Sequence, residues 1–410
     1  SVLMPTYNSN LDWLREAIDS LRAQIFYNWE LCIADDASTN PELRTFLENL
    51  AEEDERIKVF FCKENGHISR ASNAGLKCCS GDWVALMDHD DLLAEHALYH
   101  VAETINRYPD VQLIYSDEDK IDERGNRFDP YFKCDWNRDL FYSQNMISHL
   151  GVYRKDVLEK IGGFRPGFEG SQDYDLALRY IEQIDERTIH HIPRVLYHWR
   201  VHSESTAGGV EAKPYAVTAA ETALQQHFDR LGVSASIEGL PFGYRVRYEL
   251  PESPPCVSLI IPTRNAMHLL KVCVDSILEK TLYDNYEIII VDNGSDDPEI
   301  LEYFSQLIRK ENVRVIRDDR PFNFSKLNNA AVAKANGDIV GFVNNDIEVI
   351  NGNWLFELVS IAVQPEVGVV GAKLLYPDNT VQHAGVVLGI GGVGSHAFKG
   401  LSKDALGYFG

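Results

Sequence analysis

Two stretches of this chain carry the same four short motifs, in the same order and at almost the same spacing. Between the second and third motifs the spacing changes by a single residue. Chance does not preserve the order and spacing of four blocks, so the sequence indicates two copies of one domain type. The blocks are polar and follow apolar runs, so the repeat predicts a shared site as well as a shared fold. Residues 1–8 recur as 258–265, residues 32–38 as 289–295, residues 70–74 as 326–330, and residues 88–90 as 344–346.

Bulk properties narrow the class of protein. A chain of 410 residues is long enough for two domains with complete cores. The net charge of −23 argues against nucleic acid and against direct binding to anionic lipid. No apolar run approaches the roughly 20 residues that span a bilayer, and no signal peptide is recognised. The seven cysteines form no C-x-x-C pair, which predicts a reduced, cytoplasmic protein rather than a disulfide scaffold or a zinc site.

Apolar runs alternate with helical patterns in both copies. This alternation predicts βαβ units and a mostly parallel sheet with helices on both faces, an α/β fold of the Rossmann-like kind. In the first copy we expect strands at 2–4, 31–34, 59–61 and 83–87, and helices at 10–25, 41–53 and 69–79. In the second copy we expect strands at 257–261, 287–291, 313–316 and 339–343.

The sequence between the copies is of a different kind. Residues 211–230 have a helical pattern, residues 234–250 resemble a strand pair interrupted at Pro241, and residues 251–255 form a proline-rich linker. We therefore expect a first domain at 1–207, a connector at 208–256 and a second domain at 257–410.

Polar residues follow three strands of the first copy, at 5–7, 35–36 and 88–90. In open α/β sheets ligands bind at the carboxyl ends of the strands. Neither G-x-x-x-x-G-K-[ST] nor G-x-G-x-x-G occurs, so a P-loop or dinucleotide site lacks its phosphate cradle. Asp88 and Asp90 could instead hold Mg²⁺ or Mn²⁺, because both ions prefer carboxylate ligands. A single D-x-D is also compatible with a solvated acidic turn, but its recurrence in the second copy favours the metal site.

Taken together, the motifs resemble those of a tandem family 2 glycosyltransferase of the GT-A fold, the inverting type that uses nucleotide sugars to build bacterial surface polysaccharides such as O-antigen. The resemblance covers nearly all of residues 1–206 and, for the second copy, 257 to about 400. As an ordered set the motifs are specific, although none is so alone. They lie at residues 5–8, 35–38, 66–75, 81–82, 88–91, 115–119, 162–164, 172–176 and 197–202.

The resemblance implies a nucleotide site at the ends of the first strands. Thr6 and Asp36 would hold the base and ribose, beside Pro5 and Tyr7. The alternative for Asp36 is a turn or helix N-cap residue, because its surroundings are rich in turn formers. On the third expected helix, Arg70 and Asn73 share one face and would meet the nucleotide and its diphosphate, although an amphipathic helix also carries surface arginines.

By the same resemblance, Asp88 and Asp90 would carry a Mn²⁺ or Mg²⁺ ion and the donor diphosphate. His198 or His202 could complete the metal shell, and Arg200 could contact phosphate. These three residues alternate along an extended stretch, which predicts that they point the same way. The sequence leaves open which histidine is the ligand.

Asp173 is the residue expected to act as general base, because inversion requires a carboxylate that takes the proton of the acceptor hydroxyl. The alternative is that Asp173 only caps the helix that begins there. Asp175 is less suited, since it lies in the first full helical turn, and Gln172 replaces the family's usual Glu. Asp117 and Asp119 would line the donor or acceptor side, unless they belong to an acidic turn.

The second copy departs from the first. Asn344 replaces the first Asp of D-x-D, and Asn293 replaces the second Asp of the nucleotide motif. The position equivalent to Asp173 would fall beyond Gly410, so we expect an incomplete second domain with a nucleotide half. Its expected nucleotide and metal residues are Thr263, Asp292, Lys326, Asn329, Asn344 and Asp346.

The prediction is a metal-dependent inverting hexosyltransferase that moves a sugar from a nucleoside-diphosphate sugar to a hydroxyl of a glycan, expected to be lipid-linked. The expected location is the cytoplasm, with peripheral association at the inner membrane face. A sugar nucleotidyltransferase is a rival, but it would need a glycine-rich, basic loop after the first strand, and residues 5–10 lack one. For the second domain, a non-catalytic carbohydrate-binding or scaffold module is a further alternative.

Overall fold

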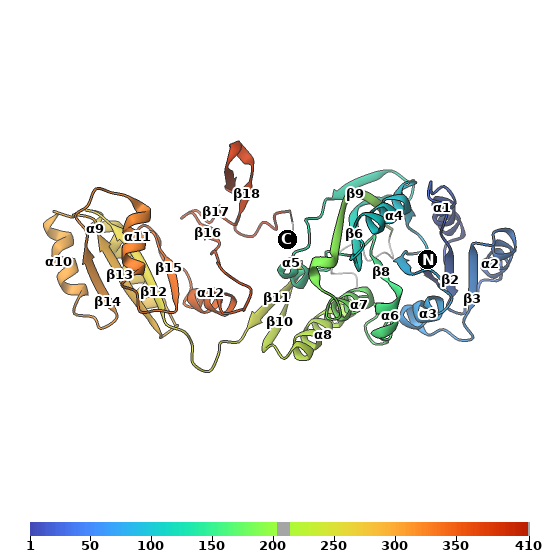
Figure 1. Ribbon diagram of the computed structural model, residues 1–410, viewed down its shortest axis with the longest axis horizontal. Coiled ribbons are helices and arrows are strands. Elements are labelled where there is room, and N and C mark those ends of the chain that lie inside the picture. Colours follow the sequence, from blue (N-terminus) through green and yellow to red (C-terminus); the bar gives the residue numbers. More distant parts are fainter. Residues whose placement is uncertain (203–213, 409–410) are drawn as a thin grey trace. The chain divides into compact units, whose positions relative to one another are not determined.

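The computed structural model describes residues 1–202 and 214–408. The chain divides into two compact units, Ser1–Val246 and Arg247–Gly407 (Figure 1). The expected end of the first domain at residue 207 and the first residues of the expected helix at 211–230 lie outside the described residues. In the described part of the chain, no helix is both long and apolar enough to cross a bilayer, and all seven cysteines are free thiols.

A mixed sheet forms the centre of the first unit, in the order β3-β2-β1-β4-β8-β6-β9-β5, with β7 paired to β6. β1 pairs in parallel with both β2 and β4, so the four strands expected from the sequence are confirmed. Beyond β4 the sheet turns antiparallel at β8 and then contains the long parallel pair of β6 and β9. The strands are β1 (Val2–Thr6), β2 (Leu31–Asp35), β3 (Ile57–Phe61), β4 (Trp83–Leu86), β5 (Leu92–Leu93), β6 (Leu113–Ile121), β7 (Arg127–Tyr131), β8 (Val152–Arg154) and β9 (Ile189–Arg200).

The helices begin where the sequence supplies caps. Asn10 accepts hydrogen bonds from the amides of Asp12 and Trp13 at the start of α1 (Leu11–Arg22), and Asn40 accepts one from Glu42 at the start of α2 (Pro41–Glu53). The apolar face of α1, including Leu14 and Ile18, is fully buried, as its periodicity predicts. The other helices of this part are α3 (His67–Leu76), α4 (Ala97–Arg107), α5 (Arg138–Ser143), α6 (Lys155–Lys160) and α7 (Gln172–Ile181).

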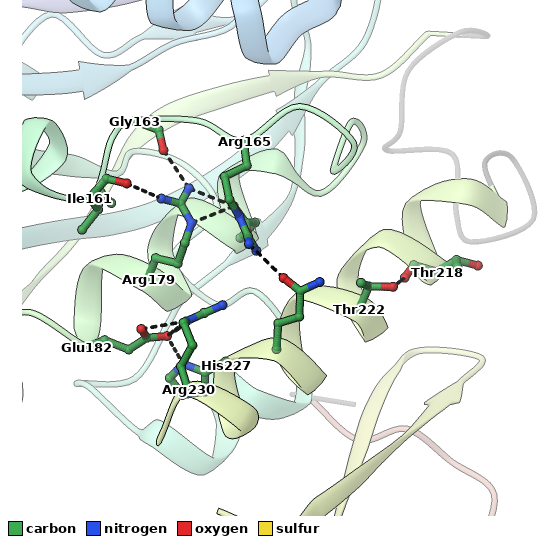
Figure 2. A network of polar contacts seen from close by, with 11 residues as sticks. Ile161, Gly163, Arg165, Arg179, Glu182, Thr218, Thr222, His227 and Arg230 are labelled. Atoms are coloured by element: carbon green, nitrogen blue, oxygen red, sulfur yellow. Dashed lines mark hydrogen bonds and ion pairs between the residues drawn. The ribbon is translucent and has the colours of Figure 1, made fainter. Parts of the chain in front are cut away.

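Residues expected to form a separate connector pack on the first unit instead. They comprise α8 (Pro214–Leu231) and the hairpin of β10 (Ala235–Leu240) and β11 (Gly243–Tyr248) (Figure 1). Polar contacts join α8 to α7 and to the loop before it (Figure 2). Arg165 donates to Gln226 at 2.8 Å, and Glu182 accepts from both His227 and Arg230 at 2.7 Å. Figure 2 shows these contacts along one side of α8.

The second unit contains a parallel sheet of order β14-β13-β12-β15, the same order as β3-β2-β1-β4 in the first unit. The register at the strand ends also agrees, because Thr263 pairs with Asp292 as Thr6 pairs with Asp35. The elements are β12 (Val257–Thr263), α9 (Met267–Lys280), β13 (Tyr286–Asp292), α10 (Pro298–Leu307), β14 (Val313–Arg317), α11 (Phe324–Val332), β15 (Ile339–Phe342) and α12 (Trp354–Ala362), followed by the short pairs β16 (Leu374–Leu375) with β17 (Val381–His383) and β18 (Val386–Leu388) with β19 (Gly394–His396).

Candidate active site

A cavity of about 1270 Å³ opens at the carboxyl ends of β1 and β4 in the first unit. Six carboxylates and four imidazoles line it, and none of its described lining residues is Lys or Arg. Such a cavity repels a diphosphate unless a cation accompanies it. The acidic residues are Asp36, Asp88, Asp90, Glu118, Glu169 and Asp173, and the histidines are His67, His89, His149 and His202.

The ends of β1 and β2 form one corner of this cavity. Pro5, Thr6, Tyr7 and Asp36 all line it. The amide of Asp36 donates to the carbonyl of Thr6 at 2.9 Å, and Asp36 Oδ1 accepts from the amide of Gly66 at 2.8 Å. Asn40 caps α2, so Asp36 is not the helix cap that the sequence left open. Asp36 therefore ties β2 to the loop before α3 within the cavity.

The face of α3 that meets the cavity is not the one expected. Residues His67, Ile68, Ala71 and Ser72 line it. Asn73 instead bonds the backbone of Phe164 with both amide atoms, donating to its carbonyl at 2.7 Å and accepting from its amide at 2.9 Å.

Arg70 lies on the exposed side of α3, outside the cavity lining. The cavity lining thus lies on a different stripe of α3 from Arg70 and Asn73, and their contact with the nucleotide stays a prediction. The shift follows from the helical period, because residues 68, 71 and 72 form one stripe and residues 70 and 73 form another.

Asp88 and Asp90 both line the cavity directly after β4. Asp90 Oδ2 lies 2.9 Å from His202 Nε2. The His202 ring packs on Trp13 with ring centroids 4.8 Å apart. A carboxylate and an imidazole nitrogen at this separation are suitable ligands for a divalent cation.

His198 and Arg200 lie elsewhere. His198 Nδ1 contacts Asp119 Oδ1 at 2.5 Å, burial lowers the pKa of this imidazole, and the residue does not line the cavity. The side chain of Arg200 is fully buried, with Nε donating to the Asp90 carbonyl at 2.7 Å and one terminal nitrogen donating to Glu16 at 2.6 Å.

The expectation that His198, Arg200 and His202 share one cavity face is therefore corrected. β9 ends at Arg200, so the strand alternation does not continue to His202. Trp199, which lies between His198 and Arg200 in β9, lines the cavity. The role of Arg200 is to hold the Asp90–Asp91 turn, because its own amide also donates to Asp91 Oδ1 at 2.7 Å.

His149 is a cavity residue that no sequence motif marks. Its Nε2 lies 4.0 Å from Asp88 Oδ2, its ring stacks on Tyr197 at 4.4 Å between centroids, and its buried Nδ1 has no hydrogen-bond partner among the described residues. Within the described residues, Asp88, Asp91 and His149 are the one group of three whose ligand atoms lie within 4.8 Å of one another.

The oxygens of Asp91 are already engaged, however. Asp91 is fully buried, burial raises its pKa, and its two oxygens accept from the amide of Arg200 and from the hydroxyl of Tyr197. The hydroxyl of Tyr197 in turn accepts from the amide of Asp88 at 3.1 Å. Asp91 therefore anchors the acidic turn, while Asp88 and Asp90 face the cavity.

Asp173 faces the same cavity from the first turn of α7. Ser171 occupies the N-cap position, so Asp173 is not the cap of this helix. Asn145 Nδ2 donates to Asp173 Oδ2 at 2.7 Å. Burial raises the pKa of Asp173, and His149 acts in the opposite direction. Gln172, also at the cavity, accepts the amide of Gly170 at 2.8 Å.

Asp175 points away from the cavity and is fully buried. It forms ion pairs with Arg165 and with Arg179, the latter at 2.8 Å. The guanidinium of Arg179 also donates to the carbonyls of Ile161 and Gly163 (Figure 2). Asp175 thus fixes the first turn of α7 rather than facing a substrate.

The acidic run 117–119 lies within β6, not in an acidic turn, and the strand places its members on opposite faces. Asp117 contacts His191 at 2.8 Å, and Asp119 pairs with His198 and, at 2.6 Å, with Arg127. Glu118 alone of the three lines the cavity, where it accepts from Lys133 Nζ at 2.9 Å. The expected placement of Asp117 and Asp119 at the donor or acceptor is corrected, since the intervening residue faces the cavity.

The corresponding strand ends of the second unit are arranged differently. Asp292 Oδ1 accepts from the amide of Ser295 at 2.9 Å, as Asp35 does from that of Ser38, but Asp292 Oδ2 pairs with Arg317 at 2.7 Å. Arg317 stands in register where the first unit has Phe61. Asn345 donates to the hydroxyl of Thr263 at 3.0 Å. The remaining expected residues are exposed: Lys326, Asn329, Asn344 and Asp346.

The chain was compared with known proteins. The model of Glycosyl transferase family 2 matches residues 1–162 and 258–387. The chain is 50% identical over 413 residues to the uncharacterised protein y4gI of Sinorhizobium fredii, covering 100% of this chain and 45% of that protein. It is 40% identical over 407 residues to the O-antigen biosynthesis protein RfbC of Myxococcus xanthus, covering 99% of this chain and 32% of that protein. The chain thus spans less than half the length of these two relatives.

Among solved structures, residues 1–349 of TarS from S. aureus in complex with UDP match at 21% identity and a TM-score of 0.42, covering 56% of this chain and 70% of that one. The family match extends over most of the chain and includes β1, β4 and the acidic turn of the first unit. This chain belongs to glycosyl transferase family 2.

Proposed function

We propose that the first unit transfers a hexose, with inversion, from a nucleoside-diphosphate sugar to a hydroxyl of a glycan in bacterial surface-polysaccharide synthesis. The single observation that carries this proposal is the meeting of Asp88, Asp90 and Asp173 in one cavity. Asp88 and Asp90 can bind the metal ion that accompanies a diphosphate, and Asp173 can accept a proton as a general base. The 40% identity to an O-antigen biosynthesis protein supports the same class of product.

The nucleotide is proposed to bind at the ends of β1 and β2. Thr6 and Asp36 supply polar atoms for the base and ribose, and Tyr7, 47% exposed, supplies a ring beside them. Pro5 precedes Thr6, the last residue of β1.

A divalent cation, Mn²⁺ or Mg²⁺, is proposed to accompany the donor. The donor set fits, because Asp90 and His202 place an oxygen and a nitrogen 2.9 Å apart and Asp88 lies in the same turn. The described lining residues include no Lys or Arg, so a bound cation would offset the negative charge of the diphosphate. When bound, the ion would neutralise the charge that develops on the leaving nucleoside diphosphate.

Asp173 is proposed to be the base. As the acceptor oxygen bonds to the anomeric carbon, the bond from that carbon to the diphosphate oxygen breaks, and the acceptor proton passes to a carboxylate oxygen of Asp173. The leaving group carries away the electron pair. Asn145 orients the carboxylate through its 2.7 Å hydrogen bond, and the N-terminus of α7 favours the ionised form.

The expected second domain, residues 257–410, is proposed to be of the same type as the first. Its sheet repeats the strand order of the first, which supports a nucleotide site at Thr263 and Asp292. The pairing of Asp292 with Arg317 favours a weaker or non-catalytic carbohydrate-binding role, because the carboxylate is already neutralised.

The acceptor is proposed to be a lipid-linked glycan at the cytoplasmic face of the inner membrane, which the protein would meet peripherally. The seven free thiols fit a reducing compartment.

The test is a screen of nucleotide sugars against the full chain, with Mn²⁺, with Mg²⁺ and with EDTA. We expect one donor to be hydrolysed slowly in the absence of acceptor, and only with metal. A chain that binds nucleotide with Mn²⁺ yet neither hydrolyses nor transfers any sugar would contradict the proposal. Release of pyrophosphate from a sugar phosphate and a nucleoside triphosphate would favour the nucleotidyltransferase.

A further inference from the structure

Two tyrosines from outside the family match line the cavity beside the proposed base. Residues 163–257 lie between the two stretches that match the family model. Within them, α8 supplies Tyr215 and β11 supplies Tyr244, and both side chains line the cavity that contains Asp173. The side chain of Tyr215 is 56% exposed, so part of its ring is free to contact a ligand.

Tyr244 packs against Tyr174, which lies in the first turn of α7. Its ring lies nearly parallel to that of Tyr174, with centroids 6.1 Å apart and an angle of 28° between planes. Tyr174 is buried, and its hydroxyl donates to the carbonyl of Phe141 at 2.5 Å. Burial raises the pKa of Tyr244 to about 12, with Glu221 and Asp173 adding to the shift. The Tyr244 hydroxyl therefore lies within electrostatic reach of Asp173 and stays protonated at neutral pH.

The backbone just before Tyr244 packs closely against the last residue of α5. A Cβ on Gly243 would lie 2.4 Å from the carbonyl oxygen of Ser143, at a positive φ of 152°. Only glycine lets β11 approach the end of α5 so closely. Asn145, the partner of Asp173, follows two residues after Ser143. The short segment from Ser143 to Asn145 thus contacts both the β10–β11 hairpin and Asp173.

Tyr215 covers the loop that leads into the Asp173 helix. A Cβ on Gly170 would lie 2.8 Å from Cε2 of Tyr215, so the ring rests on this glycine. Ser171, the next residue, donates its hydroxyl to the carbonyl of Ala216 at 2.8 Å. Further along α8, the contacts of Gln226 and His227 fasten the helix to the first unit (Figure 2). The position of Tyr215 is therefore set by the same element that carries the base.

We propose that Tyr215 and Tyr244 form the acceptor subsite and bind a pyranose ring of the glycan that receives the sugar. This inference rests on the proposed function. A sugar ring has apolar C–H faces and polar edges, so it binds between aromatic side chains and hydrogen-bonding groups. Glu169 and Gln172 line the same cavity as the two tyrosines and supply such groups for the hydroxyls.

The nucleotide does not compete for this position. Its proposed residues Thr6 and Asp36 belong to β1 and β2, whereas the tyrosines belong to elements that pack on α7. A ring bound by the tyrosines lies next to Asp173, where an acceptor hydroxyl has to give up its proton. The proposed subsite thus gives α8 and the β10–β11 hairpin, which pack on the first unit, a role in binding the acceptor.

The experiment uses the full chain, the donor that the screen identifies, and a panel of p-nitrophenyl mono- and disaccharide glycosides as acceptors. We expect Tyr244→Ala and Tyr215→Ala each to raise the KM for the acceptor by about 10-fold, because a stacked ring contributes roughly 1 kcal/mol beyond its buried area. The KM for the donor should stay within twofold. Tyr244→Phe should restore the acceptor KM, because it keeps the ring.

Phe242→Ala is the matched control. Phe242 lies on the same hairpin, is 60% exposed and does not line the cavity, so its removal should change neither KM. Melting curves of all variants check that they fold. An unchanged acceptor KM in both alanine variants, or a rise in the donor KM instead, would overturn the subsite.

Saturation-transfer NMR with the same glycosides, in the presence of UDP and Mn²⁺, measures binding without turnover. Wild type should give signals from the ring protons of at least one glycoside, and the alanine variants should lose them. If wild type turns over no donor, the proposed function fails, while these signals still decide the subsite. If wild type transfers sugar and binds glycosides as the alanine variants do, the subsite alone fails.

Discussion

Asn145 donates a 2.7 Å hydrogen bond to Oδ2 of Asp173, and so joins the loop after α5 to the helix that carries the proposed base. This bond stabilises the ionised carboxylate, which is the form that can accept a proton. Burial has the opposite effect and raises the pKa of Asp173. In the proposed mechanism, the balance between the Asn145 hydrogen bond and burial sets the pH at which Asp173 ionises and can act as a base.

Asn145→Leu should shift the pH dependence of transfer. Removal of the donor disfavours the ionised form, so the already raised pKa of Asp173 should rise further. Because the base works when ionised, activity is lost as pH falls through that pKa, and the acid limb of kcat should move to higher pH by about one unit. The measurement is kcat against pH between 4 and 9, at saturating substrates.

Asn137→Ala serves as the control for Asn145→Leu. Asn137 caps α5 and does not line the cavity, so its loss should lower stability without moving the acid limb. An acid limb that stays in place in Asn145→Leu would show that the bond does not set the ionisation of the base.

Asp173→Asn should lower kcat for transfer by about 10²- to 10⁴-fold, the usual contribution of a positioned base. The amide keeps the shape of the side chain, so the affinity for UDP with Mn²⁺, measured by calorimetry, should remain. Turnover equal to that of wild type would remove Asp173 from the mechanism.

His202→Ala and His198→Ala should separate the two histidines. His202 lies 2.9 Å from Asp90 at the cavity, so its loss should weaken Mn²⁺-dependent nucleotide binding by roughly 10- to 100-fold. His198 contacts Asp119 away from the cavity, so its loss should leave that affinity intact and lower the free energy of unfolding by about 1–3 kcal/mol. Asp90→Ala should behave as His202→Ala does. The reverse pattern, in titrations of Mn²⁺ and in urea denaturation, would make His198 the ligand.

Asp175→Ala should destabilise the first unit by about 3–5 kcal/mol, because it leaves Arg179 buried without its carboxylate. Thermal unfolding followed by circular dichroism measures the loss. Arg187→Ala breaks an exposed pair with Asp185 and should leave the melting temperature nearly unchanged. Equal effects of the two substitutions would show that the buried pair does not anchor α7.

Local sequence patterns predict some residues of the candidate site but not others. Strand ends are visible in sequence because apolar runs stop abruptly, and Thr6, Asp36, Asp88 and Asp90 all line the cavity as expected. Asp173 lines it too, because it follows a glycine-rich turn at a helix start. Asn145 and His149 carry no such signal, since they come from an irregular stretch after α5 whose path depends on packing.

The amino-acid sequence by itself determined the repeated motifs, the order of strands and helices in both units and the family. These features depend on periodicity and on residues adjacent in the chain, so no distant contact is needed to read them. Only the tertiary structure decided that Glu118 rather than Asp117 or Asp119 meets the cavity, that His202 rather than His198 meets Asp90, and that Tyr215 and Tyr244 line the cavity that contains Asp173. The physical reason is that each of these depends on which face of an element is turned inward, and on where a strand stops alternating. Packing against residues more than 100 positions away settles both, as the contact of Arg200 with Asp90 shows.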